Sequence, residues 1–425
     1  MTLLLIFGGL LLLSLIGIPI AFALGVIGLI GILVSPVPLM AVPLMIFNSA
    51  ETYTLVAIPL FMLMGAIIEK AGLGRILIDF ASSLVGWMRG GLAQMNVIDS
   101  LLFGGISGSA AADVASIGQI MITEMTRRGY PRNFVAALTS STAELAILIP
   151  PSIPLIVYGV LANTSIAKLF VAGIIPGCIL AAAYMLLVYI LARRNKWPVH
   201  EPFSMKRVAT AGMNAAPSLT IPVIILGGIL GGIFTATESA AAAVTVAAFL
   251  VYVVYRSVSW KETLDMIVIT CRRTAVVMLI IAASGVLGWY MAHQRIPQQL
   301  ASQLLQVTDS PALIIILINL FLILLGTMIS GVPAMILVVP VIMPVLERIG
   351  VDPIQFGVIF AVAIAVGSQT PPVAATMLLT CVIAGITVEE MWRMNRWFIA
   401  VTIVVQFLVS FVPELSLALP RLLIR

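Results

Sequence analysis

Two stretches of the sequence combine glycine, hydroxyl side chains and a proline pair, which together suit the binding of a weakly held cation. The first is GGISGSAAAD at residues 104–113, followed by AILIPPSIP at 146–154. The second is GTMISGVP at residues 326–333, followed by AVGSQTPP at 365–372. Proline has no N–H and blocks the helical bond to the carbonyl four residues back, so carbonyl oxygens before each pair are left free. Such carbonyls, with serine or threonine hydroxyls, form a neutral oxygen cage that suits sodium.

The expected cation ligands fall in both stretches. A plainer interpretation is that small residues only let helices pack closely, but matching proline pairs in both halves of the chain favour binding. The predicted sodium ligands are Ser107, Ser109, Ala146, Ile149, Pro151, Ser330, Gly331, Gly367, Thr370 and Pro372.

An anionic substrate is expected beside these cages, because the N-termini of half-helices attract negative charge. We predict that Asp113, Ser152 and Gln369 contact it. A carboxylate within an apolar run is a functional hypothesis by default, although Asp113 could equally anchor a helix end. Glu144 and Glu238 lie near a break or a turn, where we expect water to reach them.

The elements that position these residues must be membrane helices. The 425 residues are 61% hydrophobic and 9% charged, whereas about 25% of a soluble protein is charged. A spanning helix needs about 20 apolar residues, which leaves room for roughly 10 to 14 helices or partial helices. The composition therefore predicts an all-α polytopic membrane protein and excludes a soluble domain with one or two anchors.

Several apolar runs are too short to cross a bilayer. Irregular backbone survives at membrane depth only where protein or water covers it, so these runs predict two re-entrant hairpins and broken helices. The basic segments 193–207 and 256–273 are predicted to be cytoplasmic. The charge-free loop predicted at 35–49 and the N-terminus are then predicted to be periplasmic.

The two halves of the chain share an ordered set of residues about 221 positions apart. Arg127 and Arg348, Gly129 and Gly350, and the two proline pairs keep this spacing. The match predicts inverted structural repeats, an arrangement that places a carrier's site where broken helices of both repeats meet. The predicted domains are a first repeat at 1–200, with scaffold helices at 1–50 and a hairpin and broken helix at about 85–165; a cytoplasmic connecting loop at 201–215; and a second repeat at 216–425, with scaffold helices at 216–255 and a hairpin and broken helix at about 310–385.

Cysteine and histidine are too few and too scattered to indicate metal chemistry. The three cysteines show no C-x-x-C spacing, and the two histidines lie in or beside polar segments. We therefore expect no cofactor and no transition metal, with sodium as the only coupling ion.

The chain also resembles a known family. The run GGISGSAAADVASIG at 104–118 resembles the large membrane subunit of tripartite ATP-independent periplasmic (TRAP) transporters. The same resemblance is carried by Arg128 to Phe134, IPPSI at 149–153, Tyr158-Gly159, SIAKLF at 165–170, Ile175-Pro-Gly177 and Thr370-Pro-Pro-Val373. Two features depart from the family pattern: the second hairpin has no carboxylate between Ser330 and Pro344, and Ala146 stands where many relatives have glycine.

The resemblance implies a bacterial inner-membrane importer that is coupled to sodium and is not an enzyme. Its fold would combine an elevator-type transport domain with a scaffold. Its partners would be a small four-helix membrane subunit and a soluble periplasmic substrate-binding protein. The implied substrate is a small organic acid, with C4-dicarboxylates and sialic acid as the leading candidates.

Three other functions are weighed against this one. A channel is disfavoured because two broken-helix sites suit alternating access better than a continuous pore. An ion-coupled carboxylate carrier without a binding protein is separated only by the family resemblance. A rhomboid-like intramembrane serine protease is suggested by Gly105-Ile-Ser107-Gly108, but it would require His293 as the activating base within hydrogen-bond reach.

Overall fold

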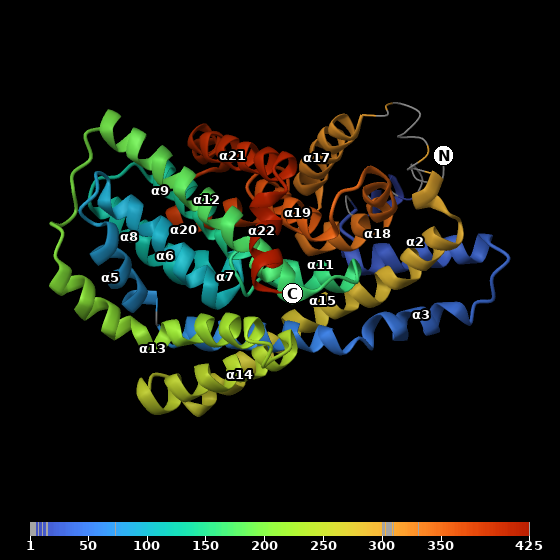
Figure 1. Cartoon of the computed structure of the whole chain (residues 1–425), viewed down its shortest axis with the longest axis horizontal. Helices are drawn as coiled ribbons and strands as arrows, with labels where there is room; N and C mark the ends of the chain where they lie inside the picture. The colour runs from blue at the N-terminus through green and yellow to red at the C-terminus, as the bar shows by residue number, and fades with distance from the viewer. Residues whose placement is uncertain are drawn as a thin grey trace.

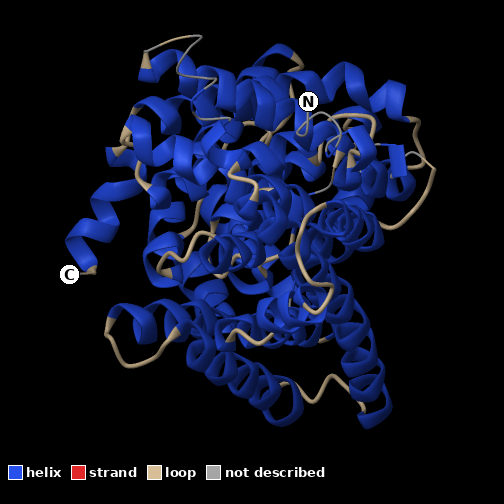
Figure 2. Ribbon diagram, turned by 90° about the vertical axis from the view of Figure 1, so that its right-hand side faces the viewer, coloured by secondary structure: helices blue, strands red, loops and turns tan. Residues whose placement is uncertain are grey.

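The computed structural model describes residues 6, 8–10, 12–13, 16–72, 74–299, 302, 308, 310–329 and 331–424. Throughout these residues the chain is built from helices and loops (Figure 2). A single β-bridge in this part of the chain joins Arg89 to Val199. Eight helical segments are long and apolar enough to cross a membrane, and a ninth is counted if the bent helix at 132–161 is taken as one span. The prediction of an all-α polytopic membrane protein is confirmed.

The first half of the chain contains these helices: α2 (Ile20–Val34), α3 (Ala41–Ala50), η1 (Tyr53–Val56), α4 (Ala57–Lys70), α5 (Gly74–Val85), α6 (Gly91–Ser107), α7 (Ala110–Asp113), η2 (Val114–Gly118), α8 (Gln119–Arg127), α9 (Arg132–Ala143), α10 (Leu145–Leu148), α11 (Ile153–Leu161) and α12 (Ile166–Arg194). The second half contains α13 (Met205–Leu230), α14 (Ala236–Phe249), η3 (Leu250–Val254), α15 (Trp260–His293), α17 (Pro311–Met328), α18 (Gly331–Ile349), α19 (Pro353–Gly367), α20 (Ala375–Ala384), α21 (Val388–Phe411) and α22 (Glu414–Leu423).

Equivalent helices recur in the same order in the two halves. Helices α9, α11 and α12 begin at residues 132, 153 and 166, and α19, α20 and α21 begin at 353, 375 and 388. Gly129 and Gly350 both have positive φ, at 85° and 73°, and both proline pairs are cis. Each half thus holds a helical hairpin, α6 to α8 or α17 to α18, followed by a helix that is interrupted at its proline pair.

Local capping explains where several of these helices begin. The Ser109, Ser152 and Ser165 hydroxyls accept from backbone N–H groups three residues later, at the starts of α7, α11 and α12. Capping boxes begin α14, α15 and α21, with the pairs Thr235 and Glu238, Ser259 and Glu262, and Thr387 and Glu390.

Helices outside the hairpins pack on one another at one side of the molecule. Helix α15 lies along α2 and α3, while α14 packs on α4 and α13 (Figure 1). The hairpins and interrupted helices meet elsewhere, where α9 packs against α20 and α21, and α11 packs against α18. The helices of the two halves are therefore interleaved rather than separate.

Three local predictions differ from the structure. Helix α13 begins at Met205, so 205–215 is helical rather than a loop, because alanine, lysine and arginine there favour helix. The stretch 35–49 is helical from Ala41 rather than a loop throughout. Glu144 is fully buried, whereas Glu238 is exposed as predicted.

Candidate functional site

The first hairpin ends against the first helix break. Helix α6 ends at Ser107, and Gly108 reverses the chain with a φ of 63°. A Cβ at Gly108 would lie 2.3 Å from the Pro151 carbonyl oxygen, and one at Gly104 would lie 2.9 Å from the Ala146 Cα. The structure therefore brings together the hairpin tip and the proline pair that the sequence placed in one cage.

The carbonyls at this break divide into two kinds. Pro151 has no N–H to offer the Ile147 carbonyl four residues earlier, and the Ser152 hydroxyl donates to that oxygen instead, at 2.5 Å. Pro150 likewise offers nothing to the Ala146 carbonyl. Ile149, which closes α10, has extended backbone with φ of −78° and ψ of 126°, so its peptide group turns away from the helix. The Ile147 carbonyl is therefore bonded to the Ser152 hydroxyl within the break, whereas the Ala146 and Ile149 carbonyls are compatible with a role as backbone oxygen ligands.

The second hairpin meets the second break in the same way. A Cβ at Gly326 would lie 3.2 Å from the Gly367 Cα, and the Val373 N–H donates to the Thr327 carbonyl at 3.1 Å. The Thr370 hydroxyl donates to the Val366 carbonyl at 2.7 Å. Hairpin and break are thus joined by a direct backbone hydrogen bond.

The other predicted ligands of the second half differ in how closely the protein surrounds them. Gly331 begins α18, and a Cβ there would lie 3.1 Å from the Ile364 side chain. Pro372 is exposed. Ser330 lies outside the described residues.

Two predicted residues of the first half have polar atoms that the protein does not satisfy. Ser107 is 1% exposed, and its Oγ has no hydrogen-bond partner among the described residues. Asp113 is equally buried, and neither of its carboxylate oxygens has a partner in hydrogen-bond geometry within that part of the chain, although the Ser100 hydroxyl interacts with it. Because buried polar atoms are normally bonded, these orphaned oxygens are the best candidates for binding an ion.

The backbone around Asp113 is also unusual. A single π-helical turn, η2, follows it directly from Val114 to Gly118. Such turns interrupt the regular bonding of a helix and occur often at functional sites. A Cβ at Gly118 would lie 2.8 Å from the Thr139 side chain, so this turn packs closely on α9.

Gln369 forms its hydrogen bonds with other residues of the protein. Its Oε1 accepts from the Ser141 hydroxyl of α9 at 2.5 Å, and its Nε2 donates to the Ala365 carbonyl at 3.1 Å. The Asn395 amide of α21 donates to its backbone oxygen at 3.0 Å. The fully buried Gln369 therefore ties the second break to α9 of the first half and to α21.

Sequence reasoning missed one buried acid near the site, Asp99, and expected another, Glu144, to be reached by water. Asp99 on α6 is fully buried, has no hydrogen-bond partner in the described part of the chain and interacts with Asp113 and Asp79. Glu144 is buried between α9 and α10, and the Thr376 hydroxyl lies 2.6 Å from its Oε1. The usable signal was an ionisable residue inside an apolar run, which in a membrane protein points to function.

The structure does not assemble the serine–histidine pair that a protease needs. The Ser107 hydroxyl has no hydrogen-bond partner among the residues described. His293 is exposed at the end of α15, where its ring stacks on Trp289 with centroids 5.0 Å apart. Among the residues that the structure describes, no base is therefore hydrogen-bonded to Ser107 to activate its oxygen.

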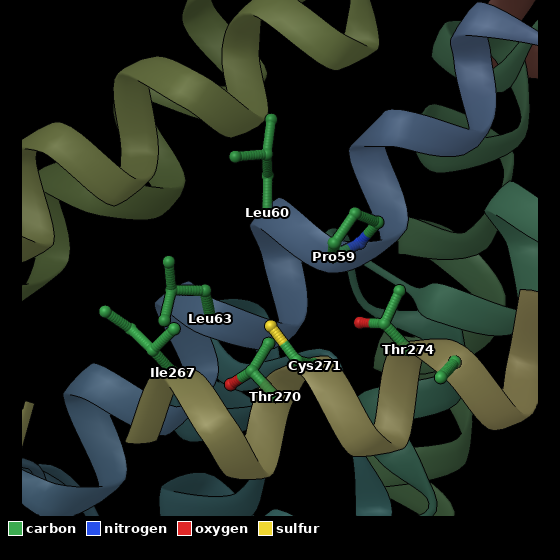
Figure 3. Close-up of a pocket in the computed structure, with 8 residues that line it drawn as sticks. Pro59, Leu60, Leu63, Ile267, Thr270, Cys271 and Thr274 are labelled. Atoms are coloured by element: carbon green, nitrogen blue, oxygen red, sulfur yellow. The ribbon is translucent and has the colours of Figure 1, made fainter. Parts of the chain in front are cut away.

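A groove between α4 and α15 offers a different environment (Figure 3). Its volume is about 330 Å³ and its lining is almost wholly apolar, contributed by Pro59, Leu60, Leu63, Ile267, Thr270, Cys271, Thr274 and Ala275. No charged side chain lines it, so it is unsuited to an organic anion. In the described part of the chain, no group of three or more histidine, cysteine or acidic residues could hold a metal ion.

Comparison with known proteins identifies the family. Residues 7–415 match the family described as "Tripartite ATP-independent periplasmic transporter, DctM component". The chain belongs to the DctM family. It is 37% identical over 400 residues to the C4-dicarboxylate TRAP transporter large permease protein DctM of Pseudomonas aeruginosa, covering 94% of each chain. It is 36% identical over 372 residues to the sialic acid TRAP transporter large permease protein SiaM of Vibrio cholerae, covering 88% of this chain and 87% of that one.

A solved structure shares the fold of this DctM-family chain. The crystal structure of the Alcanivorax borkumensis YdaH transporter, described as having an unusual topology, matches with a TM-score of 0.64. The match covers 91% of both chains at 13% identity. The family and this fold together make the chain a multi-pass membrane permease, which confirms the resemblance seen in the sequence.

Proposed function

We propose that this chain is the membrane subunit that imports a small organic anion in symport with sodium. The observation that carries the proposal is the repeated contact of a hairpin end with a proline-interrupted helix, at Gly104 with Ala146 and at Gly326 with Gly367. At the first contact Pro150 leaves the Ala146 carbonyl without its helical donor, whereas at the second contact the Gly367 carbonyl accepts from the Thr370 N–H at 3.1 Å. The buried, unpartnered Ser107 hydroxyl adds a neutral oxygen to the first cage.

The sodium cages are proposed at the residues predicted from the sequence. Backbone oxygens of Ala146, Ile149 and Pro151 would complete the first cage around Ser107 and Ser109. Ser330, Gly331, Gly367, Thr370 and Pro372 would supply the second. Asp113 would contact substrate or tune the first cage from α7, while Ser152 and Gln369 hold the breaks in shape.

The proposed substrate is a carboxylated metabolite. The two relatives reported above are named for C4-dicarboxylate and for sialic acid, at 37% and 36% identity, and both of these substrates carry a carboxylate. Because the two sequence identities are nearly equal, they do not indicate which of the two substrate classes this chain carries. Uptake should therefore be screened over both classes in parallel.

The proposed assembly follows the tripartite description of the family. A small four-helix membrane subunit would pack beside this chain, and a soluble periplasmic protein would deliver the substrate. The complex would lie in the bacterial inner membrane with the N-terminus of this chain periplasmic, which places the basic segments 193–207 and 256–273 in the cytoplasm.

Reconstituted vesicles test this function. Uptake of a carboxylated substrate should require the binding protein, the small subunit and an inward sodium gradient together. Potassium in place of sodium should abolish uptake. Equal uptake under potassium, driven by a proton gradient, would overturn sodium coupling, and uptake without the binding protein would favour a self-sufficient carrier.

Elevator movement of the hairpins is proposed because residues from both halves share one buried polar cluster. Ser140 and Thr376 bring their hydroxyl oxygens to 3.4 Å across the halves. With Cys178, Cys271 and Cys381 replaced, cysteines at these two positions should cross-link in every state. Helix α4 packs on α14, which lies in the predicted scaffold segment 216–255. Cysteines at Gly65 of α4 and at Ser107, whose carbonyl lies 3.1 Å from the Cβ position of Gly65, should therefore cross-link in one state only. The reverse result would indicate local gating about a fixed site.

A further inference from the structure

Asn319 is the only polar side chain in the apolar run 311–325 of α17, the first helix of the second hairpin. It is fully buried and bonds to one turn of α21. Its Nδ2 donates to the Ser410 hydroxyl at 3.0 Å, and its Oδ1 accepts from the Gln406 amide at 2.8 Å. The second hairpin is therefore joined to α21 by buried amide hydrogen bonds.

The interrupted helix α19 is bonded to the same part of α21. Near its start, the buried Gln355 amide donates to the Val409 and Ser410 carbonyls at 3.0 and 3.1 Å. Just past its end, the Asn395 amide of α21 donates to the Gln369 carbonyl at 3.0 Å. Helices α17 and α19 also pack directly on each other. Because both helices are bonded to α21, their positions relative to each other are fixed.

This relative position decides whether the second hairpin meets the second break. A Cβ at Gly326 of α17 would lie 3.2 Å from the Gly367 Cα, and the Val373 N–H donates to the Thr327 carbonyl at 3.1 Å. Sliding α17 by one helical turn would move Gly326 by about 5.4 Å and remove it from the crossing. The aliphatic surface of α17 offers little resistance to such a slide, whereas a buried asparagine specifies the register between packed helices.

The first half anchors its hairpin at the equivalent point. The buried Gln94 of α6, the first helix of the first hairpin, donates from its amide to the Met185 carbonyl of α12 at 3.0 Å. Met185 and Gln406 are 221 positions apart, the spacing that relates the two halves. Helices α12 and α21 each follow the interrupted helix of their own half. A side-chain amide on the first helix of each hairpin thus reaches the same position of the helix after the break.

We propose that Asn319 is a positioning residue that fixes the register of the second hairpin against the second helix break. It acts through Gln406 and Ser410, because these residues set where α17 lies on α21 and therefore where α17 crosses α19. The rest of the α17 surface stays aliphatic and packed when the amide is lost, so the register changes while the helix is retained. The register does not rest on the proposed function; only its consequence, which is that the oxygens of the second sodium cage move apart, does.

Hydrogen exchange at the Val373 amide tests the proposal, because this N–H donates to the Thr327 carbonyl across the crossing. Residue-resolved mass spectrometry of the purified full-length chain measures it without a transport assay. Moving the asparagine by one turn, with Ile315→Asn and Asn319→Ile in one variant, keeps the composition of α17. If Asn319 sets the register, the amide at 315 takes its place on α21 and draws α17 along by one turn.

The hairpin carbonyl at the crossing would then come from residue 323, which lies inside α17 and already accepts a helical hydrogen bond. The Val373 amide should therefore exchange roughly tenfold faster, while the melting temperature stays close to that of the wild type. An unshifted α17 would instead leave the new amide without its partners. A lower melting temperature with wild-type exchange at Val373 would therefore overturn the proposal.

A second variant removes the anchor rather than moving it. Asn319→Leu with Gln406→Leu replaces both amides by apolar side chains, which is close to neutral for stability, and it eliminates Gln406 Oε1, which has no partner among the described residues. Exchange at Val373 should again rise. Gln94→Leu is the matched control, because it removes a buried amide from the other hairpin and should leave exchange at Val373 unchanged. Equal exchange at Val373 in all three variants would overturn the proposal, even if sodium-driven uptake were normal.

Discussion

Gly326 and Gly367 cross in backbone contact, so that a Cβ on Gly367 would lie 2.4 Å from the Gly326 carbonyl oxygen. Real Cβ atoms do not approach other atoms this closely, so the crossing requires glycine at 367. The equivalent crossing in the first half pairs Gly104 with Ala146, where a Cβ on Gly104 would lie 2.9 Å from the Ala146 Cα. One glycine is therefore enough in the first half, whereas the second crossing is tighter and uses two.

Gly367→Ala should destabilise the protein because the added methyl group meets backbone that cannot move aside. Overpacking of this kind typically costs about 1–3 kcal/mol. Gly227→Ala is the matched control, since nothing lies within 4 Å of its Cβ position in α13, and alanine there should stabilise by about 0.5–1 kcal/mol. Thermal unfolding of the purified variants measures both. Equal shifts in the two variants would contradict the contact.

Ser107→Ala should weaken sodium binding without weakening the fold. Its hydroxyl has no hydrogen bond to lose within the described structure, so the stability measured without sodium should not fall. Loss of one neutral ligand should raise the sodium concentration for half-maximal uptake roughly tenfold, which corresponds to about 1.4 kcal/mol. An unchanged sodium dependence would make Ser107 a packing residue.

Ser152→Ala should give the opposite pattern, because its hydroxyl donates to the Ile147 carbonyl at 2.5 Å inside the break. Leaving that buried oxygen unsatisfied should cost about 1–3 kcal/mol of stability. Thermal unfolding measures whether Ser152 stabilises the helix break, and substrate titration measures whether it contacts the substrate. A raised KM with normal stability would instead support the prediction that Ser152 contacts substrate.

Gln369 and Ser141 should be energetically coupled. Each replaced alone by alanine removes the 2.5 Å hydrogen bond between them, but the double variant removes both groups. A double-mutant cycle on thermal stability should therefore give a coupling of about 0.5–3 kcal/mol. Additive effects, together with a KM increase confined to Gln369→Ala, would favour the substrate contact predicted from the sequence.

The linker between α12 and α13 should loosen as the pH falls. His200 Nδ1 faces the Arg128 guanidinium at 3.2 Å and must be unprotonated to accept from it. Partial burial, followed by the positive charges of Arg128 and Arg207, lowers the pKa of His200 below its usual 6.5, with Glu124 opposing. The undocked linker therefore binds a proton more readily, and docking is lost as pH falls from above 6.5 toward the lowered pKa.

Hydrogen exchange of the amides at 195–204, corrected for intrinsic rates, measures this docking. Protection should fall between about pH 7.5 and about pH 5.5 in the wild type. His200→Gln should flatten the profile, since its amide oxygen can still accept from Arg128 at any pH. The only other histidine in the chain is His293, and His293→Gln should leave the profile unchanged. A pH-dependent profile in His200→Gln would assign the effect to another group.

The sequence alone determined the features that depend on local chemistry. Apolar content indicated a membrane protein, and proline without an N–H located both helix breaks. Spacing between the halves predicted the repeated helices, and the motifs around 104–118 and 149–153 indicated the family. Each of these inferences follows from residues close together in the chain or from a regular offset, so folding in three dimensions does not change them.

Only the tertiary structure decided which polar groups pair with one another. Gln369 has the same side chain whether it contacts a substrate or braces a helix break, and its partner Ser141, 228 positions earlier, became evident only after folding. Glu144 was expected near water because a break follows it, yet packing of α9 against α20 and α21 excludes water from it. Hydrogen bonds between residues more than 200 positions apart depend on how helices pack, and helix packing is set by the whole fold rather than by local sequence.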